Sequence, residues 1–398
     1  MLSVYLDNNA TTIVAPEAIE AMVPYLAAHY GNPSSVHRIG ATAAAGLKTA
    51  REQAAAFLRC RESEIVFTSG GTESNNAAIR GVTDALPGKR HIVATQVEHP
   101  SVLEVCRDLE RKGWGATYLG VDRDGALDLA ELERSITDDT ALVSVMWANN
   151  ETGVVFPIDE IAGITAARRV LLHVDAVQAA GKIPIDLGKT LVDLLTLSGH
   201  KLHAPKGVGL LFVRKDTPFR PLIVGGGQER GRRSGTENIP GIVGFGKAME
   251  IASAQGAAAI DQVRRLRDKL ENYILESIPN TARNGAAEPR LPNTTSVRFE
   301  GMEGEAILLL LDEAGICAST GSACSTGAVE PSHVLKAMGL SDTEALATVR
   351  FSLSRYMSAD KIDRVIEVLP GVVRRLSTRP SARLQPRSPD DTYRAKKS

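Results

Sequence analysis

Short apolar runs alternate with amphipathic helix-like segments between about residue 60 and residue 215. Runs such as 141–146 (Ala-Leu-Val-Ser-Val-Met) lack the strict alternation of a half-buried strand. They are typical of strands that are covered by helices on both faces of a mostly parallel sheet. The alternation of apolar runs with helix-like segments therefore predicts an α/β fold. The strands it predicts are residues 65–68, 91–95, 141–147, 170–174, 192–197 and 208–213.

Polar clusters follow five of these runs. In open α/β sheets, ligands bind beyond the carboxyl ends of the strands, which meet at one edge. We therefore expect the five clusters to lie together and to form one ligand site. They are residues 69–72, 98–99, 149–151, 175–178 and 198–201.

A second pattern begins near residue 256 and predicts a smaller α+β unit. It contains a long charged helix, then a strand, a helix and another strand, at residues 256–278, 294–299, 303–314 and 348–353. We expect a large domain over residues 13–257 and a small domain made of residues 1–12 and 258–375. Residues 376–398 are rich in Arg, Pro and Ser, which predicts a disordered tail.

Composition limits the class of protein. A chain of 398 residues suggests two domains. With 46 Lys and Arg against 47 Asp and Glu, there is no basic excess to indicate a nucleic-acid partner, so we expect a small ligand. Four cysteines without paired spacing, no hydrophobic leader and no long apolar run indicate a cytoplasmic protein without a membrane partner.

Cys324 lies in a run of small residues, 319–327, with almost no apolar bulk. A thiol placed there is reachable by solvent, as a nucleophilic or sulfur-carrying cysteine requires, although redox sensing is open too. Cys60, Cys106 and Cys317 lie in patterns typical of small buried hydrophobic residues. Metal sites using His200 with His203, or Cys317 with Cys324, lack supporting ligands, so we predict no metal.

Residues 69–76 (Ser-Gly-Gly-Thr-Glu-Ser-Asn-Asn) follow a predicted strand and open a predicted helix. The backbone N–H groups there and the Thr72 hydroxyl are suited to hold a phosphate, because the N-terminal end of a helix is positive. A Gly-rich turn with Thr72 as helix cap explains the same pattern equally well.

Lys201 and Asp175 stand at the ends of two predicted strands. A lysine beside a phosphate site, with a carboxylate to pair with a protonated pyridine nitrogen, is what pyridoxal 5'-phosphate (PLP) requires. A surface position is the alternative for Lys201. His99 is suited to stack on the cofactor ring and to move protons, or it simply caps a loop.

The chain resembles the cysteine desulfurases, class V PLP enzymes of fold type I, over nearly its whole length. The matching segments are 5–12, 31–35, 67–76, 149–153, 173–178, 198–209, 225–238, 321–324 and 349–353. The nitrogen-fixation (NifS-like) branch is most similar, in residues 147–153, 203–205 and 330–333. The resemblance implies a large domain with a mostly parallel seven-stranded sheet, and a smaller α+β domain that carries the catalytic cysteine.

The resemblance also implies the roles of single residues. Lys201 binds PLP covalently, Asp175 pairs with the pyridine nitrogen, Gln178 contacts the ring hydroxyl and His99 stacks on the ring. The phosphate is held by Gly71, Thr72, Ser198 and His200, and by Thr236 from a second subunit, so a homodimer follows. Asn150 lies by the ring and substrate, and Arg350 binds the substrate carboxylate.

The implied reaction converts L-cysteine to L-alanine. Lys201 removes the α-proton, His99 relays protons, and the Cys324 thiolate takes the sulfur as a persulfide. The sulfur then passes to an iron-sulfur scaffold or another acceptor protein, plausibly for nitrogenase maturation. The alternatives are a selenocysteine lyase or another class V lyase or transaminase, and a non-catalytic partner-binding protein on the same fold.

Overall fold

A computed structural model describes residues 3–321 and 330–377. The strands are β1 (Val4–Tyr5), β2 (Ile65–Thr68), β3 (His91–Thr95), β4 (Gly115–Leu119), β5 (Thr140–Met146), β6 (Leu171–Asp175), β7 (Leu194–Ser198), β8 (Gly209–Val213), β9 (Thr281–Arg283), β10 (Thr294–Phe299), β11 (Ile316–Cys317) and β12 (Thr348–Ser352). The helices are α1 (Pro16–Ala27), α2 (Arg38–Leu58), α3 (Gly71–Ala85), α4 (Pro100–Arg111), α5 (Leu129–Ser135), α6 (Ile158–Ala167), α7 (Ile239–Ser277), α8 (Gly304–Glu313), α9 (His333–Ala337), α10 (Asp342–Leu346) and α11 (Ala359–Ser377).

Seven strands form the main sheet, in the order β2-β8-β7-β6-β5-β3-β4. The pairs from β7 to β4 are parallel, whereas β8 runs antiparallel to both of its neighbours, β7 and β2. The carboxyl ends of β2, β3, β5, β6 and β7 therefore lie along one edge. The α/β fold with a mostly parallel, seven-stranded sheet is confirmed.

Helices cover both faces of this sheet, which explains why its strands are apolar without alternation. Ile65 and Phe67 of β2 belong to a hydrophobic cluster with α2, α6 and the first part of α7. Val66, between them in sequence, belongs to a second cluster with α3 and α4 on the opposite face. Burial on both faces removes the polar positions that an exposed face would require.

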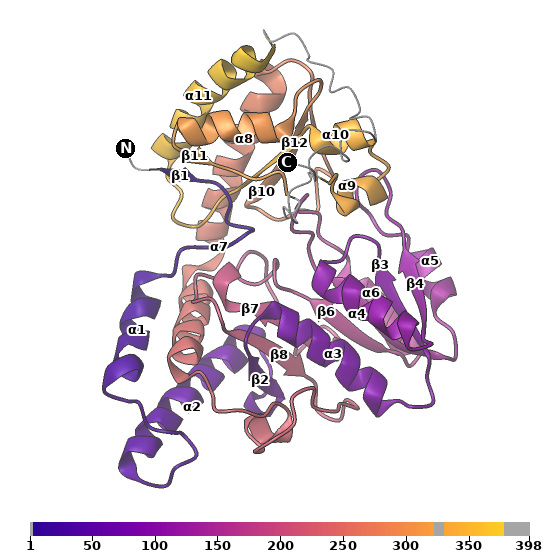
Figure 1. Ribbon diagram of the computed structural model, residues 1–398, viewed down its shortest axis with the longest axis vertical. Helices are drawn as coiled ribbons and strands as arrows, with labels where there is room; N and C mark the ends of the chain where they lie inside the picture. Colours follow the sequence, from indigo (N-terminus) through magenta and orange to yellow (C-terminus); the bar gives the residue numbers. More distant parts are fainter. Residues whose placement is uncertain (1–2, 322–329, 378–398) are drawn as a thin grey trace, which may run out of the picture.

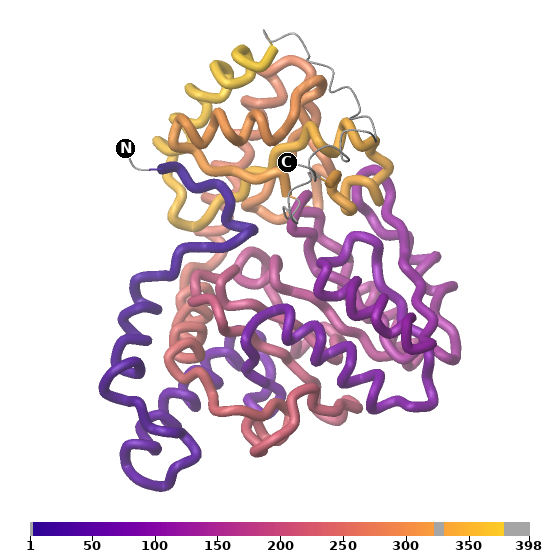
Figure 2. Tube along the Cα trace, in the orientation of Figure 1, coloured from indigo at the N-terminus to yellow at the C-terminus, as the bar shows by residue number. Residues whose placement is uncertain are grey.

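A smaller unit packs at the carboxyl end of the main sheet, as Figure 1 shows. It holds the antiparallel sheet β12-β10-β9 and the parallel pair β1-β11, with α8 and α11 packed on their own hydrophobic cluster. Val4 and Leu6 belong to this cluster, so the start of the chain lies against its last third (Figure 2). This is the smaller α+β unit that the sequence predicts.

Helix α7 connects the two units and contains a break at Gly256, where φ is 63° and ψ is −172°. Before the break, Phe245 packs in the main cluster; after it, Leu270 packs in the cluster of the smaller unit. The break coincides with the predicted boundary at residue 257. However, Val334 and Leu335 of α9 pack in the main cluster, so the division into two domains stays a prediction.

The predicted tail, residues 376–398, lies almost wholly outside the described residues, because α11 includes 376 and 377 and the description ends there. Within the described part of the chain, no helix combines the length and the apolar character needed to cross a membrane.

Candidate functional site

A cavity of about 530 Å³ opens at the carboxyl edge of the main sheet, where the smaller unit covers it. This volume suits a cofactor or a small ligand. The five predicted polar clusters all reach the same edge, and nearly all of the predicted site residues line this cavity. They are Gly71, Thr72, His99, Asn150, Asp175, Gln178, Ser198, His200, Lys201 and Arg350.

Lys201 is the last residue of a short 3₁₀ helix, Gly199–Lys201, that directly follows β7. Its Nζ donates hydrogen bonds to the backbone oxygens of Asn9, at 2.5 Å, and Ala10, at 2.7 Å. Burial lowers the pKa of the Lys201 amine to about 8, and Arg350 lowers it further against the opposing effects of Asp7 and Asp175. A lysine whose pKa is lowered in this way serves readily as a nucleophile or base.

Asp175 ends β6 and is held by two donors. Its Oδ2 accepts from Asn75 Nδ2 at 2.8 Å, and its Oδ1 accepts from the backbone N–H of Val177 at 3.0 Å. Asn75, on α3, is 1% exposed and was not predicted as a site residue, although it lies in the 69–76 segment. The two bonds fix the carboxylate at the floor of the cavity, where it is suited to pair with a protonated ring nitrogen.

The start of α3 forms a cradle at one end of the cavity. Gly71 is its first residue, and a Cβ atom there would lie 3.1 Å from Val177 Cγ2 and 3.4 Å from Ser198 Cβ. A side chain at residue 71 would press on these two neighbours, so glycine suits the close approach of the helix start to β7. Thr72 and Ser198 supply hydroxyls beside this positive helix end, an arrangement suited to a phosphate.

His200 lines the same end of the cavity. Its Nδ1 lies 3.2 Å from Thr11 Oγ1. Burial lowers the pKa of His200 to about 4, with Lys201 and Lys206 adding to the shift. The imidazole is therefore neutral near pH 7, and it is suited to contact a phosphate as a hydrogen-bonding group rather than as a cation.

His99 caps a helix, as one of the two interpretations expects, and its predicted role at the cofactor ring stays a prediction. It caps α4, because its Nδ1 accepts from the Ser101 backbone N–H at 3.1 Å, and it also lines the cavity. Burial lowers the pKa of His99, Asp175 opposes the shift, and Lys201 and His333 add to it. With Nδ1 engaged as an acceptor, Nε2 carries the proton of the neutral ring, so a proton donor is available at that nitrogen.

Arg350 reaches the cavity from β12 in the smaller unit. Its Nη2 pairs with Asp7 Oδ1 at 2.7 Å, and its Nη1 donates to the backbone oxygen of Asn150 at 3.0 Å. Nε is buried without a hydrogen-bond partner among the described residues. The guanidinium is thus held in place with donor capacity to spare, as carboxylate binding requires.

Asn9 joins most of these groups, and we did not predict its role. Its backbone oxygen accepts from both Lys201 and Gln178, and its Nδ2 donates to the backbone oxygen of Asn150 at 3.0 Å. The motif 5–12 was the only signal in the sequence, since these partners are more than 100 residues away.

The segments 147–153 and 330–333, singled out in the sequence, meet in the structure. Ser332 Oγ donates to Glu151 Oε2 at 2.5 Å and also caps α9. His333 Nε2 donates to the backbone oxygen of Glu98 at 3.0 Å. These contacts hold the start of α9 against the loops that carry Asn150 and His99.

Cys324 lies outside the described residues, while Ser319 and Gly321, just before it in sequence, line the cavity. Cys60, Cys106 and Cys317 have free thiols. Burial raises the pKa of Cys60 and Cys106 to about 12 and that of Cys317 above its usual value, so these thiols stay protonated. Over residues 3–321 and 330–377, no group of three His, Cys, Asp or Glu is arranged to hold a metal ion.

Thr236 is the one predicted residue among the described ones that the structure does not bring to the cavity. It lies exposed between the short 3₁₀ helix at Glu229–Gly231 and α7. The expectation that a second subunit supplies this residue stays a prediction.

Comparisons with known proteins agree with this geometry. The family model described as Aminotransferase class-V matches residues 4–365. A cysteine desulfurase of Trichormus azollae is 58% identical over 376 residues, 94% of each chain. The cysteine desulfurase NifS of Azotobacter vinelandii is 50% identical over 377 residues, again 94% of each. A solved NifS-like protein is 41% identical with a TM-score of 0.88, covering 94% of this chain and all of its own.

The chain belongs to the aminotransferase class-V family. Within the family it groups with the cysteine desulfurases, which use PLP as cofactor. The residues present suit that cofactor. At Gly71, a Cβ atom would occupy the space at the helix start where a phosphate would bind. The same cavity is lined by hydroxyl groups, by the fixed carboxylate of Asp175 and by the Lys201 amine, whose pKa is lowered. When bound, PLP supplies an electron sink for the substrate α-carbon.

Proposed function

We propose that this protein converts L-cysteine to L-alanine and holds the released sulfur as a persulfide on Cys324. The observation that carries the proposal is that Lys201, Asp175 and Arg350 line the same cavity. Lys201 would bind the cofactor covalently. Asp175 would pair with the ring nitrogen, and Gln178 would contact the ring hydroxyl. The phosphate would be held by Gly71, Thr72, Ser198 and His200.

Each side chain then has a task that its position supports. Arg350 would bind the substrate carboxylate through its fork, with Asn150 beside it. The Lys201 amine, with its lowered pKa, would take the α-proton. His99, which lines the same cavity, would relay protons between the reacting groups.

The chemical change balances without a further reactant. The bond between Cβ and sulfur in cysteine breaks, and sulfur joins the Cys324 sulfur, so a thiol becomes a persulfide. A hydrogen takes the place of sulfur on Cβ, which gives alanine. The persulfide sulfur then passes to a thiol of an acceptor protein.

We also propose a homodimer in which Thr236 completes the phosphate site of the partner. One side of α1 exposes Ile19, Val23 and Leu26, at 48, 52 and 65%. Their i, i+4, i+7 spacing places them on one stripe of the helix. An apolar stripe of this kind is typical of an interface.

The acceptor is proposed to be an iron-sulfur scaffold protein, and the setting the cytoplasm. A role in nitrogenase maturation rests on segments 147–153 and 330–333 and on the similarity to a relative named NifS. It is tested by whether a purified nitrogenase-type scaffold receives sulfur faster than a general one.

The activity is tested with the PLP-loaded protein and three variants. Wild type is expected to release alanine from L-cysteine, with added sulfur found on Cys324 by mass spectrometry. Cys324→Ala should retain the PLP absorbance but release alanine at least about 100-fold more slowly, because the sulfur acceptor is gone.

The control variants Cys60→Ala and Cys317→Ala should behave as wild type. Persulfide found on either residue, or unchanged desulfuration by Cys324→Ala, would overturn the assignment. A wild-type protein that binds no PLP would support a non-catalytic protein instead.

A further inference from the structure

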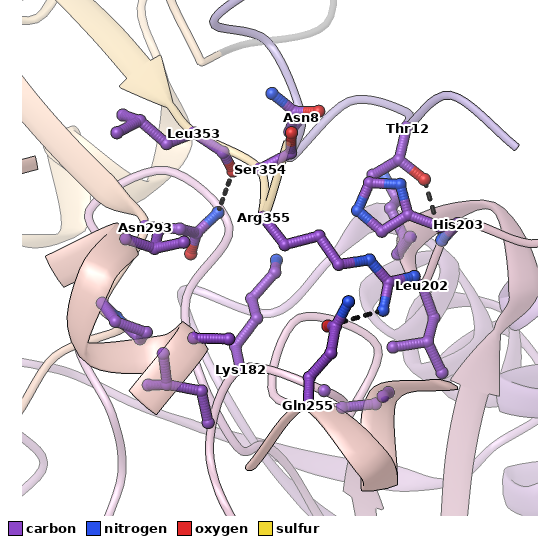
Figure 3. A pocket seen from close by; sticks show the side chains of 18 of the residues that line it. Asn8, Thr12, Lys182, Leu202, His203, Gln255, Asn293, Leu353, Ser354 and Arg355 are labelled. Carbon is purple, nitrogen blue, oxygen red and sulfur yellow. Dashed lines mark hydrogen bonds between the residues drawn. The ribbon is translucent and has the colours of Figure 1, made fainter. Parts of the chain in front are cut away.

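Lys182 lies close to the cofactor cavity without lining it. It follows β6 by a short turn, four residues after Gln178. Its Nζ is 2.6 Å from Gln178 Oε1 and 3.2 Å from Asn9 Oδ1. Figure 3 shows the side chain extending into a second cavity, of about 60 Å³, toward the side formed by Asn8 and Asn293.

No carboxylate balances this lysine among the described residues. The second cavity has neither Asp nor Glu in its described lining, and its other charged lining residues, Lys201 and Arg355, are cations. Lys201 and Arg350 both act on the charge of Lys182. Burial lowers the pKa of Lys182 well below its usual value, and these two cations add to the shift. The oxygens of Gln178 and Asn9 each accept a hydrogen bond from this amine.

The hydrogen bond from Lys182 helps to determine the orientation of the Gln178 side-chain amide. Oε1 accepts from Lys182, and Nε2 donates to the backbone oxygen of Asn9 at 3.0 Å. Both partners require the same orientation, because a backbone oxygen only accepts. The second N–H of Nε2 therefore remains for the cavity that Gln178 lines.

We propose that Lys182 is a positioning residue that makes Gln178 a hydrogen-bond donor, and not an acceptor, toward the ring hydroxyl oxygen of the cofactor. The inference rests on the proposed role of Gln178. Without Lys182, only the hydrogen bond to the Asn9 backbone oxygen still holds the amide in this orientation. An amide that turns by half a turn places its oxygen against the ring oxygen. Two acceptor oxygens repel, so the ionised ring oxygen would lose its stabilisation.

Asn9 belongs to the same hydrogen-bond network and also contacts the catalytic lysine. Its side chain accepts from Lys182 and from Asn293 Nδ2, at 3.1 Å, while its backbone oxygen accepts from Gln178 and Lys201. The contacts of the Asn9 side chain with Asn293 and Thr294 remain when the Lys182 amine is lost, so we expect the Asn9 peptide to stay in place and the effect of Lys182 to pass through Gln178.

The test compares Lys182→Met, Gln178→Ala and the double variant as PLP-loaded proteins. Methionine keeps the unbranched shape of lysine but cannot donate. Lys182→Met should shift the visible spectrum toward the shorter-wavelength form, which has a neutral ring hydroxyl, and should speed PLP loss on dilution roughly tenfold. The double variant should match Gln178→Ala in both measurements, because Lys182 acts through Gln178.

A surface variant and a chemical rescue complete the design. Lys189→Met removes a lysine whose side chain is 83% exposed, and it should leave spectrum and PLP retention unchanged. In Lys182→Ala, the added space adjoins the second cavity, so ethylamine should restore the spectrum whereas ethanol should not.

The outcomes separate this inference from the proposed function. The inference would be overturned if Lys182→Met had the same spectrum and the same rate of PLP loss as wild type. It would also be overturned if the double variant showed additive effects. Either result would leave the desulfurase proposal unaffected. Wild type that forms no PLP complex would overturn the proposed function itself. Thermal melting of each variant without PLP shows whether a change reflects unfolding.

Discussion

At the scale of the single residue, Glu98 is a fully buried carboxyl beside the site. Its Oε1 accepts from Thr95 Oγ1 at 2.8 Å and from the Met146 N–H at 2.9 Å, and Oε2 has no partner among the described residues. Burial raises the pKa of Glu98 to about 8, and the charge of Asp175 adds to the effect. The side chain is therefore mostly protonated in the folded protein near pH 7.

This shift makes stability depend on pH. Because its pKa is raised, Glu98 keeps a proton in the folded state that it releases in the unfolded state. The contribution of protonated Glu98 to the free energy of unfolding is therefore complete at about pH 4 and is lost as the pH rises through 8. Glu98→Gln cannot ionise. Its free energy of unfolding should exceed that of wild type by on the order of 3 kcal/mol at pH 8 and by little at pH 5.

Urea unfolding of both proteins across this pH range measures the difference in their free energies of unfolding. The other titrating groups are the same in both proteins, so their contributions cancel in this difference. Glu133→Gln, at an exposed ion pair with Arg168, is the matched control and should show no such trend. A difference between Glu98→Gln and wild type that does not grow with pH would show that Glu98 is ionised in the folded protein.

At the scale of the element, the break in α7 depends on one glycine. Gly256 has φ 63° and ψ −172°, a conformation that is essentially restricted to glycine, and a Cβ there would meet no atom within 4 Å. Gly256→Ala should therefore lower the free energy of unfolding by about 1–3 kcal/mol through backbone strain alone. Chemical denaturation measures the loss.

Gly371→Ala is the matched control, because Gly371 lies within α11 and a Cβ there also meets nothing. It should stabilise the protein by about 0.5–1 kcal/mol, since alanine favours the helix. If Gly256→Ala were equally stabilising, α7 would be continuous in solution, and the two units would not be joined by a fixed break.

The strands show what a pattern of apolar residues can predict and what it cannot. Runs buried on both faces, such as β5, are found because their burial is continuous. β4 was not predicted, because it is an edge strand in which Gly115 is exposed and the next three residues are half-buried. Its pairing with β3 supplies the stability that its own sequence does not indicate.

At the scale of the whole molecule, the sequence predicts the site at the strand ends but not the network beneath it. Asp175 and Lys201 each directly follow an apolar run, so local pattern places them. The contacts of Asn9 with Gln178 and Lys182 join residues 169 and 173 positions apart, and they arise only when the segment after β1 packs against the turn that follows β6. Local spacing contains no information about such contacts.

The proposed exchange of Thr236 between subunits predicts that two defective chains can restore each other. Lys201→Ala lacks the cofactor lysine, and Thr236→Asp places a negative charge beside the partner's phosphate site. In a mixed dimer, one site has both changes, whereas the other has an intact Lys201 and an intact Thr236. Mixing the two inactive variants should therefore recover up to about one quarter of wild-type activity, because random exchange makes half of the dimers mixed and each contains one complete site.

Differently tagged chains show that subunits have exchanged, and alanine release measures the recovery. Mixing two differently tagged preparations of Lys201→Ala is the control and should remain inactive. If mixed dimers form but release no alanine, both residues serve the same subunit's site. The exposed Thr236 would then have to reach the cavity by a movement within its own chain. If no dimers form, the apolar stripe on α1 is not an interface between copies of this chain.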